Sequence, residues 1–330
     1  MNITVIGGGA IGMLYGARLS LGGAPVRMLT RTRQQAEELA SGGIRLLMEE
    51  QEKTAFVAAS TLAEAAHADG MELRSDEPHW YILTVKQTAL DEPLLAQLKL
   101  LLSPGDGLLC LQNGIGHLER LAAILPGAGL YAGVTSEGAL REGAAAVRHT
   151  GSGELFYGPA PLSHVQEKVL RIADPAGSGQ QALLEQWKQC AERAGIPAQP
   201  SNEMGNRIYH KLLLNAVINP LTALFGIRNG ELPAHPKGKL LMQALHRESE
   251  AVLLRAGMQT TGTEWDRLLD VCRKTALNTS SMLADLKAGR RTEVGSINGE
   301  VARLAKRLGM TAPLNEAAAA MVNALEPLNG

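Results

Sequence analysis

The chain begins Met1-Asn-Ile-Thr-Val-Ile-Gly-Gly-Gly-Ala-Ile-Gly12, and this stretch decides the fold of its first half. Ile3–Ile6 is a short β-branched strand, and a helical pattern follows the glycines. Gly7 permits a tight turn, Gly9 lets the backbone approach a pyrophosphate, and Gly12 lets the helix pack on the strand. The helix N-terminus then faces the anion. The alternative is that the glycines only shape a turn. We predict a dinucleotide-binding loop made of Gly7, Gly8, Gly9, Ala10, Ile11 and Gly12.

Composition bounds the class of protein. A chain of 330 residues favours about two domains. Hydrophobic residues make up 45% of the chain and charged residues 20%, as in a globular protein. The net charge of −1 and the aromatic content of 3% argue against nucleic acid as a partner.

Cysteine usage and the apolar segments favour a cytoplasmic protein. The three cysteines, Cys110, Cys190 and Cys272, are far apart and form no metal-binding spacing, so we expect reduced thiols and no metal site. The N-terminus lacks the basic region of a signal peptide. The longest apolar run contains two asparagines and a proline, so we expect no transmembrane span and no membrane partner.

The first 201 residues alternate between strand-like and helix-like segments, the pattern of a doubly wound parallel sheet. The predicted strands are Ile3–Ile6, Val26–Thr30, Ile44–Met48, Ala55–Ala59, Trp80–Val85, Leu108–Leu111, Leu130–Val134 and Ile196–Gln199. The predicted helices after the first are Arg33–Ser41, Thr61–His67, Leu90–Leu102, His117–Leu125 and Gln181–Ala194. We therefore expect a Rossmann-type domain over residues 1–201.

Three stretches interrupt this alternation. Gly138–Gly158 has two β-like runs, Ala145–His149 and Glu154–Tyr157, and is expected to be antiparallel. Asp69–His79 and Pro159–Gln180 are rich in charge, Pro, Gly and Ser, and we interpret them as surface insertions or a linker.

Arginine occupies the end of the second strand, where an NAD site usually carries an acidic residue for the ribose 2′-hydroxyl. Arg31 follows the strand directly and Arg33 comes two residues later. Guanidinium donors suit a 2′-phosphate, so NADP(H) is the predicted cofactor, with Arg31 the better candidate. The alternative is that both arginines are solvated loop charges.

Two polar residues follow later strands. Lys86 and Asn113 are expected at the carboxyl ends of strands, which line the ligand crevice in this architecture. By position alone, an ordinary loop role is equally acceptable for each.

The second part of the chain, residues 202–330, has the periodicity of helices, at roughly 202–225, 237–256, 264–288, 293–308 and 313–326. In the first of them Lys211, Asn215 and Asn219 recur at four-residue spacing and share one face. Burying this polar line costs free energy unless protein or a ligand pairs with it. Pro220 is expected to end or kink the helix and to free backbone carbonyls.

Further polar residues lie on the later helices. Ser281 and Asp285 are expected on one helix face, with Asn278 one turn earlier. Glu293 precedes a helix, so it either serves the first turn of that helix or has a chemical role.

These motifs together resemble the ketopantoate reductases (2-dehydropantoate 2-reductases). The resemblance rests on the Lys211–Ala223 segment, Asn229-Gly-Glu231, the Asn278–Asp285 segment and Thr292-Glu293, which follow in the family's order. The glycine loop, Thr84-Val-Lys86 and Gln112-Asn113-Gly-Ile-Gly116 also match. The resemblance covers nearly the whole chain, and the extra length falls in 69–79 and 160–180.

The resemblance implies roles for these residues. Lys211 matches the general acid, and Glu293 matches an acidic residue that contacts substrate or orients Lys211 and lies near the cofactor. The positions that match substrate-binding residues are Asn113, Asn215, Asn219, Asn229, Asn278 and Ser281. Asn113 also matches a residue near the nicotinamide, Lys86 a cofactor-contacting lysine, and Asn219 either binds substrate or only holds the kink.

The resemblance also implies a fold and a reaction. The fold is a Rossmann-type domain followed by an all-α domain like that of 6-phosphogluconate dehydrogenases. The reaction is NADPH-dependent reduction of ketopantoate to (R)-pantoate in pantothenate biosynthesis, by a monomer or homodimer. Reduction of another 2-oxo acid is the nearest alternative, and a non-catalytic NADP(H)-binding protein is a more distant one.

Overall fold

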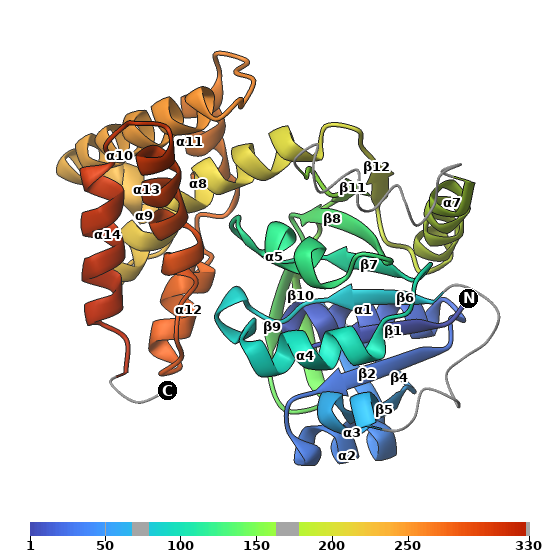
Figure 1. Ribbon diagram of the computed structural model, residues 1–330. Helices are drawn as coiled ribbons and strands as arrows, with labels where there is room; N and C mark the ends of the chain where they lie inside the picture. Colours follow the sequence, from blue (N-terminus) through green and yellow to red (C-terminus); the bar gives the residue numbers. More distant parts are fainter. Residues whose placement is uncertain (50, 68–78, 163–177, 328–330) are drawn as a thin grey trace. The chain divides into compact units, whose positions relative to one another are not determined.

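A computed structural model of the protein describes residues 1–49, 51–67, 79–162 and 178–327 (Figure 1). The chain divides into two units. The first comprises Met1–Gln112 and His117–Met204, and the second comprises Asn113–Gly116 and Gly205–Gly330. The sequence predicted a boundary after residue 201 and put Asn113 in the first domain. In the structure, the short segment Asn113–Gly116 groups with the helical unit instead.

The first unit is built on a sheet of eight strands in the order β12-β11-β8-β7-β6-β1-β2-β5. Its strands are β1 (Ile3–Ile6), β2 (Val26–Thr30), β5 (Ala58–Thr61), β6 (Trp80–Leu83), β7 (Gly107–Cys110), β8 (Gly129–Thr135), β11 (Leu155–Pro159) and β12 (Ala198–Pro200). The six strands from β5 to β8 are parallel, and β11 is antiparallel to β8. Counted along the chain, these six follow the order 3-2-1-4-5-6, which is the dinucleotide-binding order. The predicted fold class is confirmed.

Helices follow most strands of this sheet. They are α1 (Ala10–Leu21), α2 (Arg33–Gly42), α3 (Leu62–His67), the 3₁₀ turn η1 (Gln87–Ala89), α4 (Glu92–Leu101), α5 (His117–Ile124) and α7 (Ser178–Arg193). Side-chain caps lie at the starts of α2 and α4, among others. Thr32 accepts a hydrogen bond from the Gln35 amide, and Asp91 accepts one from Leu94. Each cap satisfies an N–H that the first helical turn leaves without a partner.

The few aromatic residues concentrate in the core of this sheet. The ring centroids of Trp80 and Tyr131 lie 4.9 Å apart, and those of Trp80 and Trp187 lie 5.6 Å apart. Trp80 also donates from its indole to the Leu183 carbonyl at 3.2 Å. Aromatic pairs of this kind contribute about 0.5–1.5 kcal/mol each beyond their buried area. The cluster therefore fixes α7, which carries Leu183 and Trp187, against the sheet.

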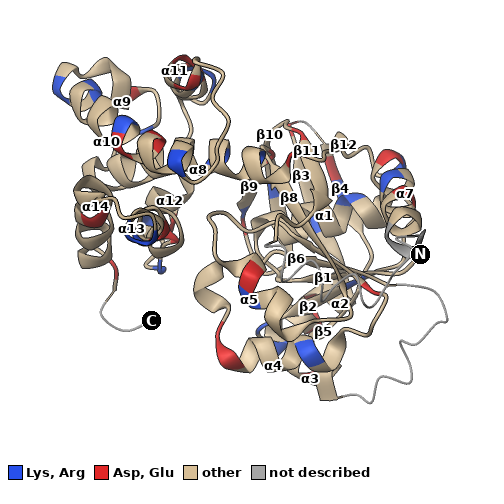
Figure 2. Ribbon diagram, turned by 45° about the horizontal axis from the view of Figure 1, so that its top comes forward, with Lys and Arg blue, Asp and Glu red and all other residues tan. Residues whose placement is uncertain are grey.

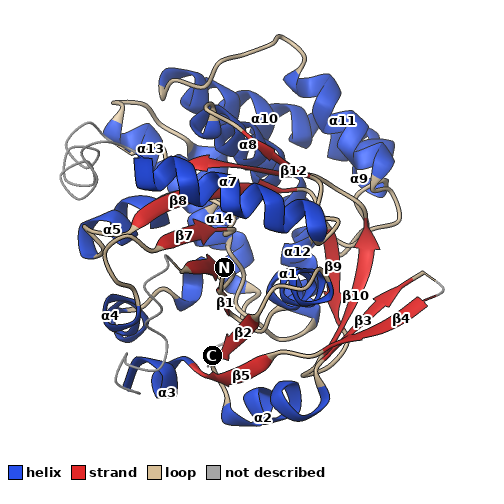
Figure 3. Cartoon of the chain, turned by 90° about the vertical axis from the view of Figure 1, so that its right-hand side faces the viewer, coloured by secondary structure: helices blue, strands red, loops and turns tan. Residues whose placement is uncertain are grey.

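Four further strands form a separate small sheet in the order β4-β3-β10-β9 (Figure 3). They are β3 (Ile44–Met48), β4 (Gln51–Ala55), β9 (Gly138–Arg141) and β10 (Ala146–Gly151). The sequence expectation was wrong in two respects. Ile44–Met48 is a strand but does not join the parallel sheet, and the predicted strand Ala55–Ala59 straddles the end of β4 and the start of β5.

The two β-like runs of Gly138–Gly158 are strands, but they do not pair with each other. β10 pairs with β9 and β3, whereas β11 pairs with β8 and β12. The expected insertions lie largely outside the described residues. At their described ends, His79 is buried with Nε2 2.8 Å from Thr4 Oγ1, and the Ala160 amide donates to Leu130, so both residues belong to the folded unit and not to an insertion.

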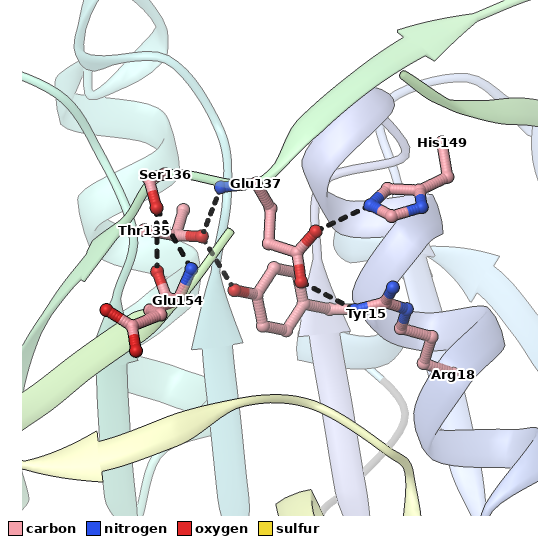
Figure 4. Close-up of polar contacts among 7 residues, drawn as sticks. All are labelled: Tyr15, Arg18, Thr135, Ser136, Glu137, His149 and Glu154. Carbon is pink, nitrogen blue, oxygen red and sulfur yellow. Dashed lines mark hydrogen bonds and ion pairs between the residues drawn. The ribbon is translucent and has the colours of Figure 1, made fainter. Parts of the chain in front are cut away.

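A buried charge cluster joins the small sheet to α1 (Figure 4). The carboxylate of Glu137, which is almost fully buried, accepts from Arg18 Nη1 at 2.6 Å and lies 2.7 Å from His149 Nε2. Arg18 is on α1, His149 is on β10, and Glu137 directly precedes β9. Burial raises the pKa of the nearby Tyr15 phenol, so its hydroxyl remains a donor, to Thr135 Oγ1 at 2.9 Å. The cluster thereby fastens β9 and β10 to the helix that starts at the glycine loop.

The second unit is helical. Its elements are α8 (Met204–Phe225), α9 (Glu231–Ala234), α10 (Pro236–Arg255), α11 (Glu264–Lys274), α12 (Ser281–Lys287), the 3₁₀ turn η2 (Val294–Ser296), α13 (Asn298–Arg307) and α14 (Pro313–Ala324). The single helix expected over 264–288 is wrong, because α11 ends at Lys274 and α12 starts afresh with Ser280 as its cap. The helix expected over 293–308 is a 3₁₀ turn followed by α13.

The sequence predicted that Pro220 ends or kinks the first helix of this unit, and the proline does not end α8. The helix continues through Pro220 to Phe225. A helix that continues past proline must satisfy the carbonyl four residues earlier in another way.

Charged residues of both signs lie on the same helices of the second unit. On α11 and α13, acidic residues lie in the first turn and basic residues in the last turn, and Figure 2 shows both colours on each helix. The three cysteines are buried free thiols. Among the helices that the structure describes, we find none with the length and apolarity needed to cross a membrane.

The Glu137 cluster yields a test of stability. Glu137→Ala leaves the Arg18 guanidinium without its carboxylate, so we expect the first unit to lose about 3 kcal/mol of unfolding free energy. Urea unfolding followed by tryptophan fluorescence measures this loss, because two of the three tryptophans, Trp80 and Trp187, are buried in that unit. Glu142→Ala, which removes an exposed ion pair with Arg148, is the matched control and should change the midpoint little. Equal midpoints for both variants would show that the cluster does not hold the unit together.

Candidate dinucleotide and substrate sites

The glycine loop links β1 to α1 in the way that the sequence predicts. Gly7 has a φ of +116°, which favours glycine, and its amide donates to the Leu29 carbonyl at 2.8 Å. A Cβ on Gly12 would lie 1.9 Å from the Gly7 carbonyl oxygen, so only glycine fits there. A Cβ on Gly9 would meet nothing within 4 Å. The fold itself therefore requires Gly7 and Gly12, whereas only a ligand would require Gly9.

The amino end of α1 presents the backbone N–H groups of a first helical turn. Its cap residue Gly9 supplies no side-chain hydrogen bond, and Ala10 and Ile11 form the first turn. The N–H groups of a first turn have no partner within the helix and carry the positive end of its dipole. The loop is thus suited to a phosphate or pyrophosphate.

Two side chains to which the sequence analysis gave no role of their own brace this loop. Thr84 Oγ1 donates to the Gly7 carbonyl at 3.0 Å. Gln35 Nε2 donates to the Gly8 carbonyl and to the Ala144 carbonyl, each at 2.8 Å. Gln35 lies on α2, and nothing in the local sequence marks it, because its partners are distant along the chain.

The two arginines after β2 differ in their surroundings. Arg33 Nε lies 3.1 Å from Glu37 Oε1 and 4.0 Å from Glu64 Oε1. Arg31 is exposed and forms no ion pair within the part of the chain that the structure describes. A guanidinium already paired with two carboxylates is less available to a phosphate, which favours Arg31 for that role.

Lys86 lies just beyond the carboxyl end of β6, as expected. It is half-buried and directly precedes η1, where its carbonyl accepts from the Ala89 amide at 2.9 Å. Its position at a strand end is the one that the sequence predicted for a cofactor contact.

The polar line of the second unit lies on the unbroken helix α8. Lys211 and Asn215 are half-buried, and Asn219 is 6% exposed. Within the described part of the chain, the side chains of Asn215 and Asn219 form no hydrogen bonds. Two amides at this depth favour a ligand face over a self-paired network.

Glu293 and Asn113 accompany Lys211. Asn113 Nδ2 donates to Glu293 Oε2 at 3.1 Å. Burial lowers the pKa of the Lys211 ammonium to about 8, and the Glu293 carboxylate opposes this shift. Glu293 provides no side-chain cap to η2, so its carboxylate faces Asn113 and Lys211 instead of serving a helix start. These three residues, far apart in sequence, therefore form one polar cluster within the second unit.

The remaining predicted residues form a second group. The backbone N–H of Asn229 donates to the backbone carbonyl of Asn278 at 3.1 Å, so the two loops that carry these residues are in contact. Asn229 is buried, and its Nδ2 donates to Thr275 Oγ1 at 2.9 Å, whereas its Oδ1 has no hydrogen-bond partner among the described residues. Asn278 lies between helices and Ser281 is the exposed first residue of α12, so the expectation that Asn278 lies one turn earlier on the same helix is wrong.

Comparison with known proteins places the chain in a family. Residues 3–161 match the family described as ketopantoate reductase PanE/ApbA, and residues 203–326 match its C-terminal part. The chain belongs to the ketopantoate reductase family.

Relatives of this ketopantoate reductase family member span its full length. It is 31% identical to a 2-dehydropantoate 2-reductase of Bacillus subtilis over 326 residues, 99% of this chain and 98% of that one. It is 29% identical to a 2-dehydropantoate 2-reductase of Archaeoglobus fulgidus, with 98% of each chain covered. A crystal structure of a probable 2-dehydropantoate 2-reductase of Bacillus subtilis has a TM-score of 0.75 at 30% identity, with 99% of this chain and 100% of that one covered.

A more distant structural relative shares the fold alone. The ternary structure of D-mandelate dehydrogenase with NADH and anilino(oxo)acetate has a TM-score of 0.81 at 22% identity and covers 98% of each chain.

Among the described residues of this ketopantoate reductase family member, no group of three or more His, Cys, Asp or Glu side chains is arranged to hold a metal ion.

The glycine loop permits a paired test. Gly9→Ala should leave thermal stability unchanged but weaken dinucleotide binding, because its Cβ points into open space beside the free N–H groups. Gly12→Ala should lower the melting temperature, because its Cβ would clash with backbone. Differential scanning fluorimetry and titration of reduced-nicotinamide fluorescence measure the two effects. Normal dinucleotide binding by the Gly9 variant would show that the glycine loop does not bind the cofactor.

Proposed function

We propose that the protein reduces ketopantoate to (R)-pantoate with NADPH, a step of pantothenate biosynthesis. Membership of the ketopantoate reductase family supports this. The observation that carries the proposal is the cluster of Lys211, Glu293 and Asn113, because it provides an ammonium of lowered pKa beside a carboxylate.

The chemistry needs a proton donor at the ketone oxygen. Hydride from the reduced nicotinamide adds to the ketone carbon, and the oxygen becomes an alkoxide that must be protonated. Lys211 stabilises the developing negative charge and donates the proton. A free lysine titrates near 10.4, so a pKa of about 8 makes Lys211 a stronger acid that is still mainly protonated at neutral pH.

The amides and carboxylate around Lys211 account for substrate recognition. Asn215 and Asn219, one and two helical turns along α8, offer donors to the ketone and carboxylate oxygens. The Glu293 carboxylate, which accepts from Asn113, is the assigned acceptor for the terminal hydroxyl of ketopantoate. Asn229, Asn278 and Ser281 complete the proposed substrate contacts.

The cofactor assignment rests on the first unit. The glycine loop binds the pyrophosphate, Arg31 binds the 2′-phosphate, and Lys86 contacts the dinucleotide from the end of β6. The proposal also includes Asn113 and Glu293 of the second unit among the residues that contact the cofactor. The absence of an acidic residue directly after β2 supports NADP(H) over NAD(H).

Reduction of another 2-oxo acid is the second candidate. D-mandelate dehydrogenase, which shares the fold, is named for a 2-hydroxy acid without a terminal hydroxyl. A non-catalytic NADP(H)-binding protein is less well supported, because Lys211 and Glu293 are both intact.

A substrate comparison tests the proposal. NADPH oxidation by the purified protein should be fast with ketopantoate and much slower with 2-oxoisovalerate, which lacks the terminal hydroxyl. Lys211→Ala should lose at least about a hundredfold in turnover while still binding NADPH. Fast turnover of 2-oxoisovalerate with none of ketopantoate would favour the second candidate, and no turnover of ketopantoate would overturn the proposed function.

The lowered pKa of Lys211 predicts a pH profile. The ammonium form is needed for ketone reduction, so kcat/KM should be level below pH 8 and fall as pH rises through about 8. The reverse oxidation of pantoate needs the amine and should rise over the same range. A profile of reduction that stayed level to pH 10 would contradict the role of Lys211 as proton donor.

The two arginines provide a matched test of cofactor choice. Arg31→Ala should raise the KM for NADPH by about tenfold or more and change that for NADH little, because only NADPH carries the 2′-phosphate. Arg33→Ala, which removes a side chain already paired with Glu37, should affect both cofactors equally little. Equal losses for NADPH and NADH in the Arg31 variant would show that Arg31 is a solvated loop charge and does not bind the 2′-phosphate.

A further inference from the structure

Helix α8 passes through a proline without ending. Pro220 has no backbone N–H, so the carbonyl of Ala216, four residues earlier, cannot receive its helical hydrogen bond. Ala216 is fully buried, so water cannot replace that bond. A buried carbonyl without a partner is costly, and the helix needs a donor from elsewhere at this turn.

Asn298 supplies that donor. Its Nδ2 donates to the Ala216 carbonyl at 2.8 Å. Asn298 is the first residue of α13 and is 0% exposed. The same Nδ2 donates to Asn315 Oδ1 at 2.9 Å, so both N–H groups of the amide are used.

The far end of this network is anchored by a carboxylate. Asn315 Nδ2 donates to Glu248 Oε1 at 2.9 Å and to Ser249 Oγ at 3.0 Å. Glu248 also accepts from the amides of Leu314 and Asn315, at 3.0 and 2.8 Å, and so caps the start of α14 from α10. Asn298 is therefore held in one orientation by α10 and α14.

The carbonyl that Asn298 serves belongs to the turn that carries the site. Ala216 lies directly after Asn215, and Pro220 lies directly after Asn219. On its own side, Asn298 follows Glu293 by one 3₁₀ turn, η2. One buried amide thus joins the polar line of α8 to the segment that carries the carboxylate facing Lys211.

We infer that Asn298 is a positioning residue: it replaces the hydrogen bond that Pro220 cannot make, and so holds the Lys211–Asn219 face in register with Glu293. This inference rests on the proposed function for the meaning of that register. In this role Asn298 contacts neither substrate nor cofactor, and acts through the backbone of α8. Misplacement of a catalytic group by about 1 Å costs up to about a hundredfold in rate.

A double-mutant cycle tests the pairing itself. Pro220→Ala supplies an N–H for the Ala216 carbonyl, so Asn298→Ala should lower the thermal midpoint much less in that background than in the natural chain. The bond from Asn298 to Asn315 is lost in both backgrounds and cancels. Asn323→Ala, an exposed asparagine on α14, is the control for a generic loss of an amide. Equal losses in the two backgrounds would show that Asn298 does not serve this carbonyl.

Kinetics and titration test the positioning. With ketopantoate, Asn298→Ala should lower kcat by about ten- to a hundredfold and move the pH midpoint of reduction, and Pro220→Ala should restore most of both. A normal kcat and pH midpoint in a destabilised Asn298 variant would make it a residue of the fold only. If the natural chain does not reduce ketopantoate, the proposed function fails separately. In that case NMR titration of Lys211 decides, because an Asn298 variant with an unchanged Lys211 pKa overturns the inference.

Discussion

The interaction on which the proposed chemistry depends is that between the Lys211 ammonium and the Glu293 carboxylate. Burial favours the neutral amine and the carboxylate favours the ammonium, and burial is the larger of the two influences. The result is a pKa of about 8, low enough to ease proton release and high enough to keep the proton at neutral pH. Asn113 completes the cluster by donating to Glu293, which limits the cost of burying that carboxylate.

The rest of the second unit keeps these groups in place. The Thr292 amide and hydroxyl both donate to Glu326 Oε1, at 2.8 and 2.6 Å, which fixes the residue before Glu293. On the opposite side, the Asn298 amide restores the helix that carries Lys211. Because Pro220 has no N–H, the Ala216 carbonyl needs a donor from outside α8. Asn298, which the buried network from Glu248 holds in place, is that donor. Within the described residues, Asn298 Oδ1 is buried without a hydrogen-bond partner, so the amide is held through its two N–H groups.

Much of the first unit was predictable because its signals are local. Short runs of mainly apolar residues, such as Ile3–Ile6 and Trp80–Leu83, indicate strands buried on both faces, and the glycine loop indicates the turn between strand and helix. Strand partners were not predictable in this way. Ile44–Met48 and Gln51–Ala55 carry exposed polar residues, a sign of the antiparallel pair that they form, but the parallel alternation around them suggested otherwise.

The candidate site was predictable as a set of residue types but not as a geometry. The four-residue spacing from Lys211 to Asn219 predicted one helical face, and α8 has it. The contact between Asn113 and Glu293 spans 180 residues, so no local pattern encodes it. The sequence could show that Pro220 leaves a carbonyl in need of a donor, but only the packing of α13 on α8 identifies Asn298 as that donor.

Direct titration of Lys211 tests the central claim. In protein with ¹³C-labelled lysine, the Lys211 side-chain signal should titrate near pH 8, and Glu293→Gln should move that midpoint lower, because the carboxylate that favours the ammonium is gone. Lys211→Arg identifies the signal by its disappearance. A midpoint near 10.4 in both the natural chain and the Glu293 variant would contradict the account of a buried lysine acid balanced by Glu293.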